Sequence, residues 1–141
     1  MSLLLLALLA IAACGQQSAP TAAATDIQIE LAVEPEPPAV GDSTLIVTLT
    51  DSNGSPVSGA AVRVEGNMDH AGMEPVIAET GESEGGVYRL PFRWTMGGGW
   101  IVTVTAALPD GRGEATETFE MFVEAVSSGS VIRQTEEAGG D

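Results

Sequence analysis

The sequence has 141 residues, with 20 Asp or Glu against 5 Lys or Arg, so its formal net charge is -15. This composition excludes nucleic-acid binding, which needs a basic surface to displace counterions. All five cations are arginine, which excludes lysine Schiff-base chemistry. The 44% hydrophobic residues suffice for one modest core. Because the chain has one histidine and one cysteine, bases and nucleophiles are scarce, and we expect a protein that is not an enzyme.

An apolar run at residues 3–13 is followed directly by Cys14. The run is too short to span a bilayer, which takes about 20 apolar residues, but it has the length of the hydrophobic part of a signal peptide. The positive residues that usually precede such a run are absent. The segment Ile11-Ala12-Ala13-Cys14 resembles the bacterial lipobox, which implies that Cys14 is lipidated and therefore not free for a disulfide or a metal.

These features predict a lipoprotein signal peptide at residues 1–13 and a flexible linker at 14–25, where small residues show no apolar period. The lipid on Cys14 would anchor the protein to the cell membrane, on its extracytoplasmic or periplasmic face.

Period-two alternation of apolar and polar residues then predicts strands over much of the chain. The predicted strands cover residues 27–33, 44–50, 60–65, 86–93, 100–107 and 114–126. Turn signals such as Asn53-Gly54 and Pro109-Asp110-Gly111 separate them, and no helical period appears. We expect an all-β fold, a small antiparallel Ig-like β-sandwich of about seven strands over 26–126, followed by an acidic disordered tail at 127–141. With no cysteine pair and no tryptophan expected to be fixed in the core, an antibody-type domain is not expected.

The candidate chemistry lies in the segment Met68-Asp69-His70-Ala71-Gly72-Met73. We expect it in a break between strands, with Gly66 and Gly72 bending the backbone. Extended backbone places Met68 and His70 on one face, and the bend at Gly72 brings Met73 back toward them.

A second segment, Trp94-Thr95-Met96-Gly97-Gly98-Gly99-Trp100, supplies Met96 from what its three consecutive glycines predict to be a tight loop. Thioethers are soft, neutral ligands that with an imidazole suit Cu(I), whereas zinc usually takes thiolates, several imidazoles or carboxylates. The candidate Cu(I) ligands are Met68, His70, Met73 and Met96, and Asp69 and Glu74 are placed to balance the charge without ligating.

Packing is the alternative use of these side chains. Methionine is often core filler, and for Met121, which alternates with Phe119 and Val123, the sequence favours packing. For the segment 68–73 the residues alone support copper binding and packing about equally. Trp94 and Trp100 either shield a bound copper ion or pack in the core or a loop, which is the commoner use of tryptophan.

Several blocks resemble the YtkA-like domain family and the related FixH-like proteins over about residues 26–125. They are Met68-Asp69-His70-Ala71-Gly72-Met73-Glu74-Pro75, Thr80-Gly81-Glu82, Gly85-Gly86-Val87-Tyr88-Arg89 and Phe92-Arg93-Trp94-Thr95-Met96-Gly97-Gly98-Gly99-Trp100. The resemblance implies an extracytoplasmic Ig-like sandwich, often a lipoprotein, with a part in copper delivery. It carries over Met68, His70, Met73 and Met96 as site residues. The sequence lacks a second histidine and a Cys-x-x-x-Cys, so it does not resemble the thiol-bearing oxidase chaperones.

We therefore expect a membrane-anchored, extracytoplasmic Cu(I) carrier or chaperone that supports copper delivery or copper tolerance. Its expected partners are the membrane, through Cys14, and a haem-copper oxidase or another copper acceptor. Two alternatives stay open without metal binding: a structural or adhesive Ig-like module, and an accessory subunit of a membrane respiratory complex.

Overall fold

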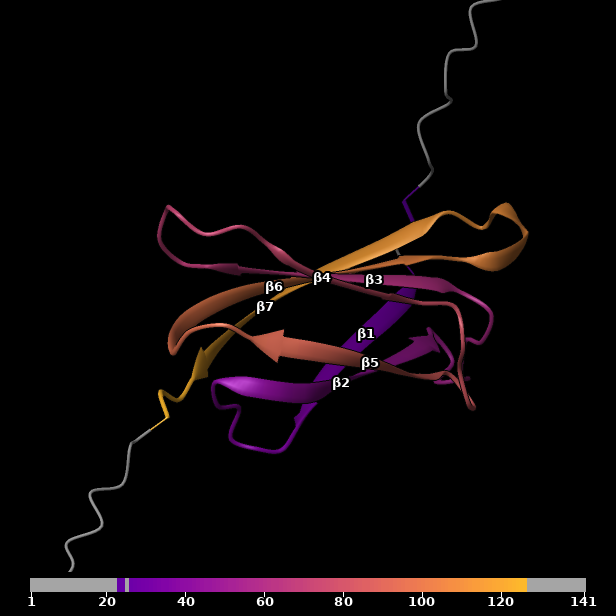
Figure 1. The fold of residues 1–141 in the computed structure, drawn as a ribbon. Helices are drawn as coiled ribbons and strands as arrows, with labels where there is room; N and C mark the ends of the chain where they lie inside the picture. Colours follow the sequence, from indigo (N-terminus) through magenta and orange to yellow (C-terminus); the bar gives the residue numbers. More distant parts are fainter. Residues whose placement is uncertain (1–22, 25, 127–141) are drawn as a thin grey trace, which may run out of the picture.

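Seven strands form two antiparallel sheets in the computed structural model, which describes residues 23–24 and 26–126 (Figure 1). The first sheet has the order β1-β2-β5 and the second the order β4-β3-β6-β7. The all-β sandwich predicted from the alternation is therefore confirmed. The strands are β1 (Ile27–Glu34), β2 (Gly41–Asp51), β3 (Ala61–Met68), β4 (Val76–Thr80), β5 (Val87–Trp94), β6 (Gly98–Ala107) and β7 (Glu114–Val123).

The core lies between the sheets and is built from every second residue of the strands, as the pleat requires. In β2 the inward row contains Leu45, Val47 and Leu49, each 0% exposed. Burying an aliphatic side chain of this size contributes roughly 1.5–3 kcal/mol. The hydroxyl of Tyr88 donates to the Val57 carbonyl (2.8 Å), and this buried bond ties the β2–β3 connection to β5.

Both tryptophans are core residues, contrary to the expectation that none is fixed there. Trp94 is 0% and Trp100 is 1% exposed. Their rings meet edge to face with centroids 5.1 Å apart, and Phe92 stands 4.8 Å from Trp94. Alternation places Trp94 at the inward end of β5 and Trp100 in the inward row of β6, which is why the core takes them.

The glycines do not break the strands where the sequence suggested. β3 continues through Gly66 to Met68, so the predicted break before Met68 is wrong. A Cβ at Gly66 would stand 2.7 Å from Phe92 Cζ and 3.3 Å from Trp100 Cε3. Gly66 therefore makes room for two rings rather than a bend. Likewise Gly98 and Gly99 open β6, and only Gly97 of the glycine run belongs to the loop.

Strand β4 was not among the predicted strands. It is a five-residue edge strand that pairs with β3 from Val62–Thr80 to Gly66–Val76. Ile77 is 50% exposed on it, so the strand buries little and its apolar alternation is weak.

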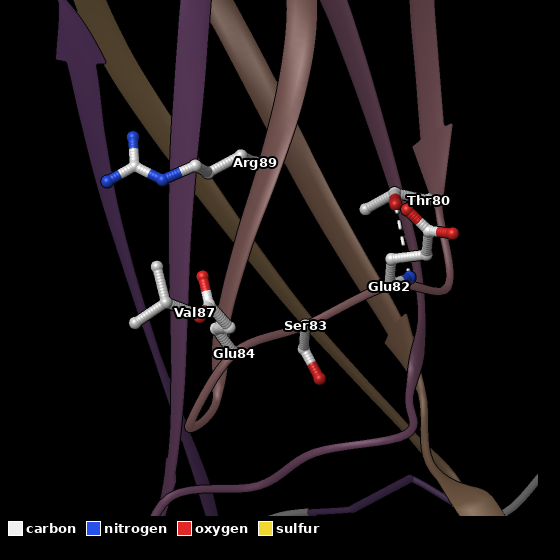
Figure 2. A pocket seen from close by; sticks show the side chains of 6 residues that line it. All are labelled: Thr80, Glu82, Ser83, Glu84, Val87 and Arg89. Carbon is white, nitrogen blue, oxygen red and sulfur yellow. Dashed lines mark hydrogen bonds between the residues drawn. The ribbon is translucent and has the colours of Figure 1, made fainter.

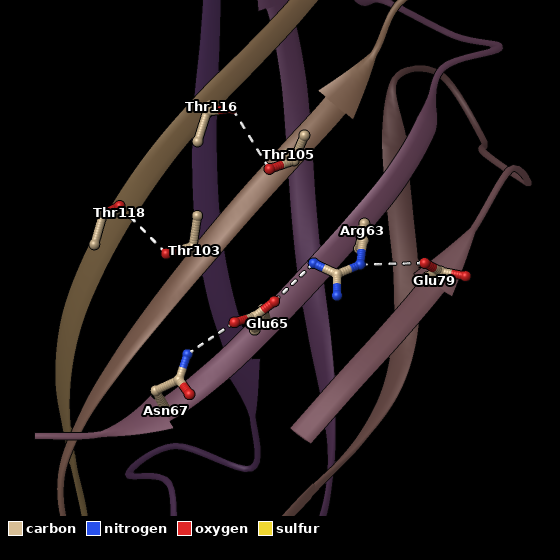
Figure 3. A network of polar contacts seen from close by, with 8 residues as sticks. All are labelled: Arg63, Glu65, Asn67, Glu79, Thr103, Thr105, Thr116 and Thr118. Atoms are coloured by element: carbon tan, nitrogen blue, oxygen red, sulfur yellow. Dashed lines mark hydrogen bonds and ion pairs between the residues drawn. The ribbon is translucent and has the colours of Figure 1, made fainter. Parts of the chain in front are cut away.

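The outer face of the second sheet is mostly polar (Figure 3). Arg63 pairs with Glu65 (2.8 Å) and Glu79 (3.3 Å), and the Asn67 amide donates to Glu65 (3.1 Å). Threonine pairs from β6 and β7 continue this surface: Thr103 with Thr118, and Thr105 with Thr116.

Within the described residues no helix is long or apolar enough to cross a membrane. The predicted turn at Pro109–Gly111 is a single turn of 3-10 helix. At the described end of the predicted linker, the Ala24 N–H donates to the Glu114 carbonyl (2.7 Å). The predicted signal peptide, Cys14 and the tail at 127–141 lie outside the described residues.

Candidate metal centre

The two methionine-bearing segments lie at the same end of the sandwich (Figure 1). Strand β3 ends at Met68, and residues 69–75 lead from it to β4. Strand β5 ends at Trp94, and residues 95–97 lead to β6 at this same end. The register places Met68 directly opposite Trp100. We call residues 69–75 the histidine loop and residues 95–97 the methionine loop.

Met68 lies at the border between core and loops. It is the last residue of the inward row of β3 and is 8% exposed. Its methyl group rests on Gly98, where an added Cβ would stand 3.2 Å from Met68 Cε. Gly98 is two residues beyond Met96, so the Met68 side chain lies against the strand start that carries the methionine loop.

Asp69 anchors the start of the histidine loop to β6. Its backbone N–H donates to the Gly99 carbonyl (3.1 Å). Its carboxylate occupies the space where a Cβ of residue 99 would stand, with Asp69 Cγ only 2.9 Å from that point. Gly98 and Gly99 thus allow Met68 and Asp69 to lie close against the backbone of β6, a role that a glycine run can signal in sequence.

The remaining candidate ligands are more accessible. His70 is exposed, with Nδ1 3.4 Å from the Ala71 carbonyl oxygen. In the tautomer that places a proton on Nδ1, the lone pair of Nε2 is free to bind a metal. Met73 is half-buried and packs against the core. Met96 is 46% exposed.

The backbone of the methionine loop is hydrogen-bonded to Trp100, one of the two buried tryptophans. The indole Nε1 of Trp100 donates to the Met96 carbonyl (3.0 Å). This bond fixes the backbone of Met96 while leaving its thioether at the surface. Both tryptophans pack in the core, one of the two uses the sequence allowed, and their role as metal shields stays a prediction.

The other end of the molecule has a different chemistry. The groove at the β4–β5 connection is formed by four oxygen-bearing side chains, one valine and one arginine, and contains neither histidine nor methionine (Figure 2). It is lined by Thr80, Glu82, Ser83, Glu84, Val87 and Arg89. Across the described part of the chain, no group of three His, Cys, Asp or Glu side chains is arranged to hold a metal. Met121, half-buried on β7, packs against the core as expected.

Fold and site together define a small β-sandwich domain with three thioethers and one imidazole at one end, where Met68 ends β3 and the other three lie on the two loops. The YtkA-like family matches residues 21–105 of the chain, which is more than half of its length. The chain belongs to the YtkA-like family. The matched range contains both loops and ends before β7. No curated protein and no solved structure matches the chain.

Proposed function

We propose that the protein is a lipid-anchored, extracytoplasmic carrier that holds one Cu(I) ion as cargo. The ligands are Met68, His70 and Met73 from the end of β3 and the histidine loop, and Met96 from the methionine loop. One observation carries the proposal: the Met68 methyl lies against Gly98, so the two ligand-bearing segments meet at one end of the sandwich.

The donor chemistry supports Cu(I) over other metals. All four donors are uncharged, and the three thioethers are soft ligands that suit Cu(I), whereas Ca²⁺ takes oxygen ligands and Zn²⁺ usually takes thiolates, several imidazoles or carboxylates. The copper ion keeps its single positive charge, and the exposed carboxylates of Asp69 and Glu74 lie on the same loop to balance it. The only cysteine precedes the sandwich, at position 14, so the site does not depend on thiols that oxidise outside the cytoplasm.

Transfer by ligand exchange follows from the graded exposure of the donors. Met96 and His70 are exposed, Met73 is half-buried and Met68 is nearly buried. Ligands of an acceptor can therefore reach and displace the exposed donors first, while Met68 leaves last. The acceptor in this proposal is a haem-copper oxidase or another copper-binding protein of the same compartment, and copper tolerance is the other outcome of the same carrying activity.

A competition titration with a chromophoric Cu(I) chelator under anaerobic conditions tests the ligand set. We expect Met68→Leu and Met73→Leu each to weaken Cu(I) binding by about tenfold or more, since even changes outside the ligand shell cost 10–100-fold. The fold should survive because this swap conserves volume and costs less than about 1.5 kcal/mol. Met121→Leu is the matched control and should bind like the natural protein. If all three variants bind equally well, the methionines are packing residues.

The same titration at about pH 7.5 and about pH 5 tests the imidazole. Histidine changes its charge in this range and only the neutral ring ligates, so Cu(I) affinity should fall at the lower pH. In His70→Ala the affinity should be weaker and should lose this part of its pH dependence. An affinity that is the same at both pH values would remove His70 from the ligand set.

A further inference from the structure

Beside the histidine loop, the outer face of the second sheet contains a hollow over Gly99. In the register Gly99 lies opposite Phe122, and Ile101 lies opposite Glu120. Because Gly99 has no side chain, the Asp69 carboxylate reaches over its backbone and forms one side of the hollow. We call this site the Gly99 hollow and define it by Asp69, Gly99, Ile101, Glu120 and Phe122.

The hollow brings two exposed apolar side chains together on a mostly polar face, whereas Ile77 lies at the other edge of the sheet, on β4. Phe122 is 70% and Ile101 is 37% exposed. Farther along the same face the outward side chains are the threonine pairs and the Arg63 network (Figure 3). An exposed phenylalanine and isoleucine on adjacent strands next to a binding loop indicate a contact surface.

The hollow also carries unneutralised negative charge. The carboxylates of Asp69 and Glu120 are exposed on it. The four ion pairs formed among the described residues use other carboxylates, those of Glu34, Asp42, Glu65 and Glu79. The surface therefore combines an aromatic ring, an aliphatic side chain and two carboxylates.

We propose that the Gly99 hollow docks a partner protein through a lysine or arginine side chain. The aliphatic stem of that side chain lies on Phe122 and Ile101, as such stems do on apolar surfaces. Its cation meets the carboxylates of Asp69 and Glu120 and the face of the Phe122 ring. The net charge of -15 disfavours a second copy of this chain and an anionic lipid surface as occupants.

The hollow lies beside the proposed copper ligands. The role of its partner in copper transfer therefore rests on the proposed function. Asp69 lies between Met68 and His70 in the chain. A partner bound over Gly99 therefore stands beside the copper ligands, where a copper donor or acceptor must dock.

A peptide of alternating leucine and arginine is the probe, and the same peptide with glutamate in place of arginine is its control. We expect the arginine peptide to shift the backbone amide signals of Asp69, Ile101, Glu120 and Phe122 in NMR spectra of the purified protein. Phe122→Ser and Glu120→Gln should each weaken binding roughly three- to tenfold. Ile77→Ser removes an apolar side chain that is 50% exposed, against 70% for Phe122, from the opposite edge of the sheet, and should have no effect.

Three results would overturn the docking surface: equal shifts with the glutamate peptide, equal loss in Phe122→Ser and Ile77→Ser, or shifts spread over the acidic surface. Concentration-dependent dimerisation or vesicle binding lost in Phe122→Ser would assign the hollow to a different occupant and reject the proposal. The Cu(I) titration separates the two proposals, because Phe122→Ser should bind Cu(I) like the natural protein. If the natural protein binds no Cu(I), the carrier function fails, while the peptide shifts still decide the docking surface.

Discussion

Gly66 determines the packing beneath the two loops, because it leaves space that two aromatic rings fill. An added Cβ would stand 2.7 Å from Phe92 Cζ and 3.3 Å from Trp100 Cε3. Both rings are buried, so neither can move away freely. Because residue 66 has no Cβ, the Trp100 ring fits at this position, and its indole Nε1 donates to the Met96 carbonyl of the methionine loop.

We expect Gly66→Ala to lower the free energy of unfolding by roughly 1–3 kcal/mol, the usual cost of overpacking a core. Urea denaturation followed by tryptophan fluorescence measures the change. The matched control is Gly81→Ala, where nothing lies within 4 Å of the added Cβ, and where we expect a change of less than about 1 kcal/mol. Equal stability of the two variants would show that the rings do not depend on Gly66.

The candidate ligands themselves were readable from single residues. Thioethers and an imidazole at 68, 70, 73 and 96 are sequence features, and their chemistry does not depend on the fold. The burial of each ligand was not readable in this way. Met68 continues the inward row of β3, a position visible only once Gly66 is known to lie in the strand.

At the level of elements, β3 carries a charge network on its outer face whose contribution to stability is lost in acid. The Arg63 guanidinium, which donates a hydrogen bond to Glu65, and then the Asn67 amide hold the pKa of Glu65 below its ordinary value of 4.5. A lowered pKa means that the folded state favours the charged carboxylate. The network therefore contributes its full stability above about pH 4.5 and loses it as the pH falls further, through the folded-state pKa.

A carboxyl NMR titration of Glu65 measures this effect directly. In Arg63→Ser we expect the pKa of Glu65 to rise toward 4.5, because the carboxylate loses the hydrogen bond from the guanidinium. Glu79→Gln removes the other ion-pair partner of Arg63 and should leave the pKa of Glu65 lowered. If the pKa of Glu65 is unchanged in Arg63→Ser, the hydrogen bond from Arg63 does not lower this pKa in solution.

The strands were predicted correctly where apolar and polar residues alternate strongly. They were missed where a strand buries little or where packing requires glycine. The strands around Ile27–Glu34 and Gly41–Asp51 follow a period of two, and both were predicted. The short edge strand Val76–Thr80 was missed because it buries little. The end of β3 and the start of β6, beside the histidine loop and the methionine loop, were missed because glycine, a weak strand former, is required there by neighbours distant in sequence.

For the whole molecule, we propose that the N-terminal segment anchors the sandwich to a membrane. If the lipobox resemblance is correct, the natural protein partitions into detergent and its mature N-terminus is a lipidated Cys14. We expect Cys14→Ser to lose the lipid and the processing that depends on it. Intact mass and detergent-phase partitioning measure both effects, with Ser18→Ala as the control in the neighbouring linker. A natural protein with an unmodified N-terminus in the aqueous phase would contradict the anchoring.

The all-β class, most of the strands, the family and the chemical type of the candidate ligands could be predicted from the sequence. These depend on local periodicity and on residue identity, which a chain carries before it folds. The folded structure was needed to see that Met68 rests on Gly98, that both tryptophans enter the core, and that Phe122 and Asp69 border one hollow. Such contacts join residues distant in the chain, because the order and register of strands in the two sheets, rather than spacing along the chain, bring them together.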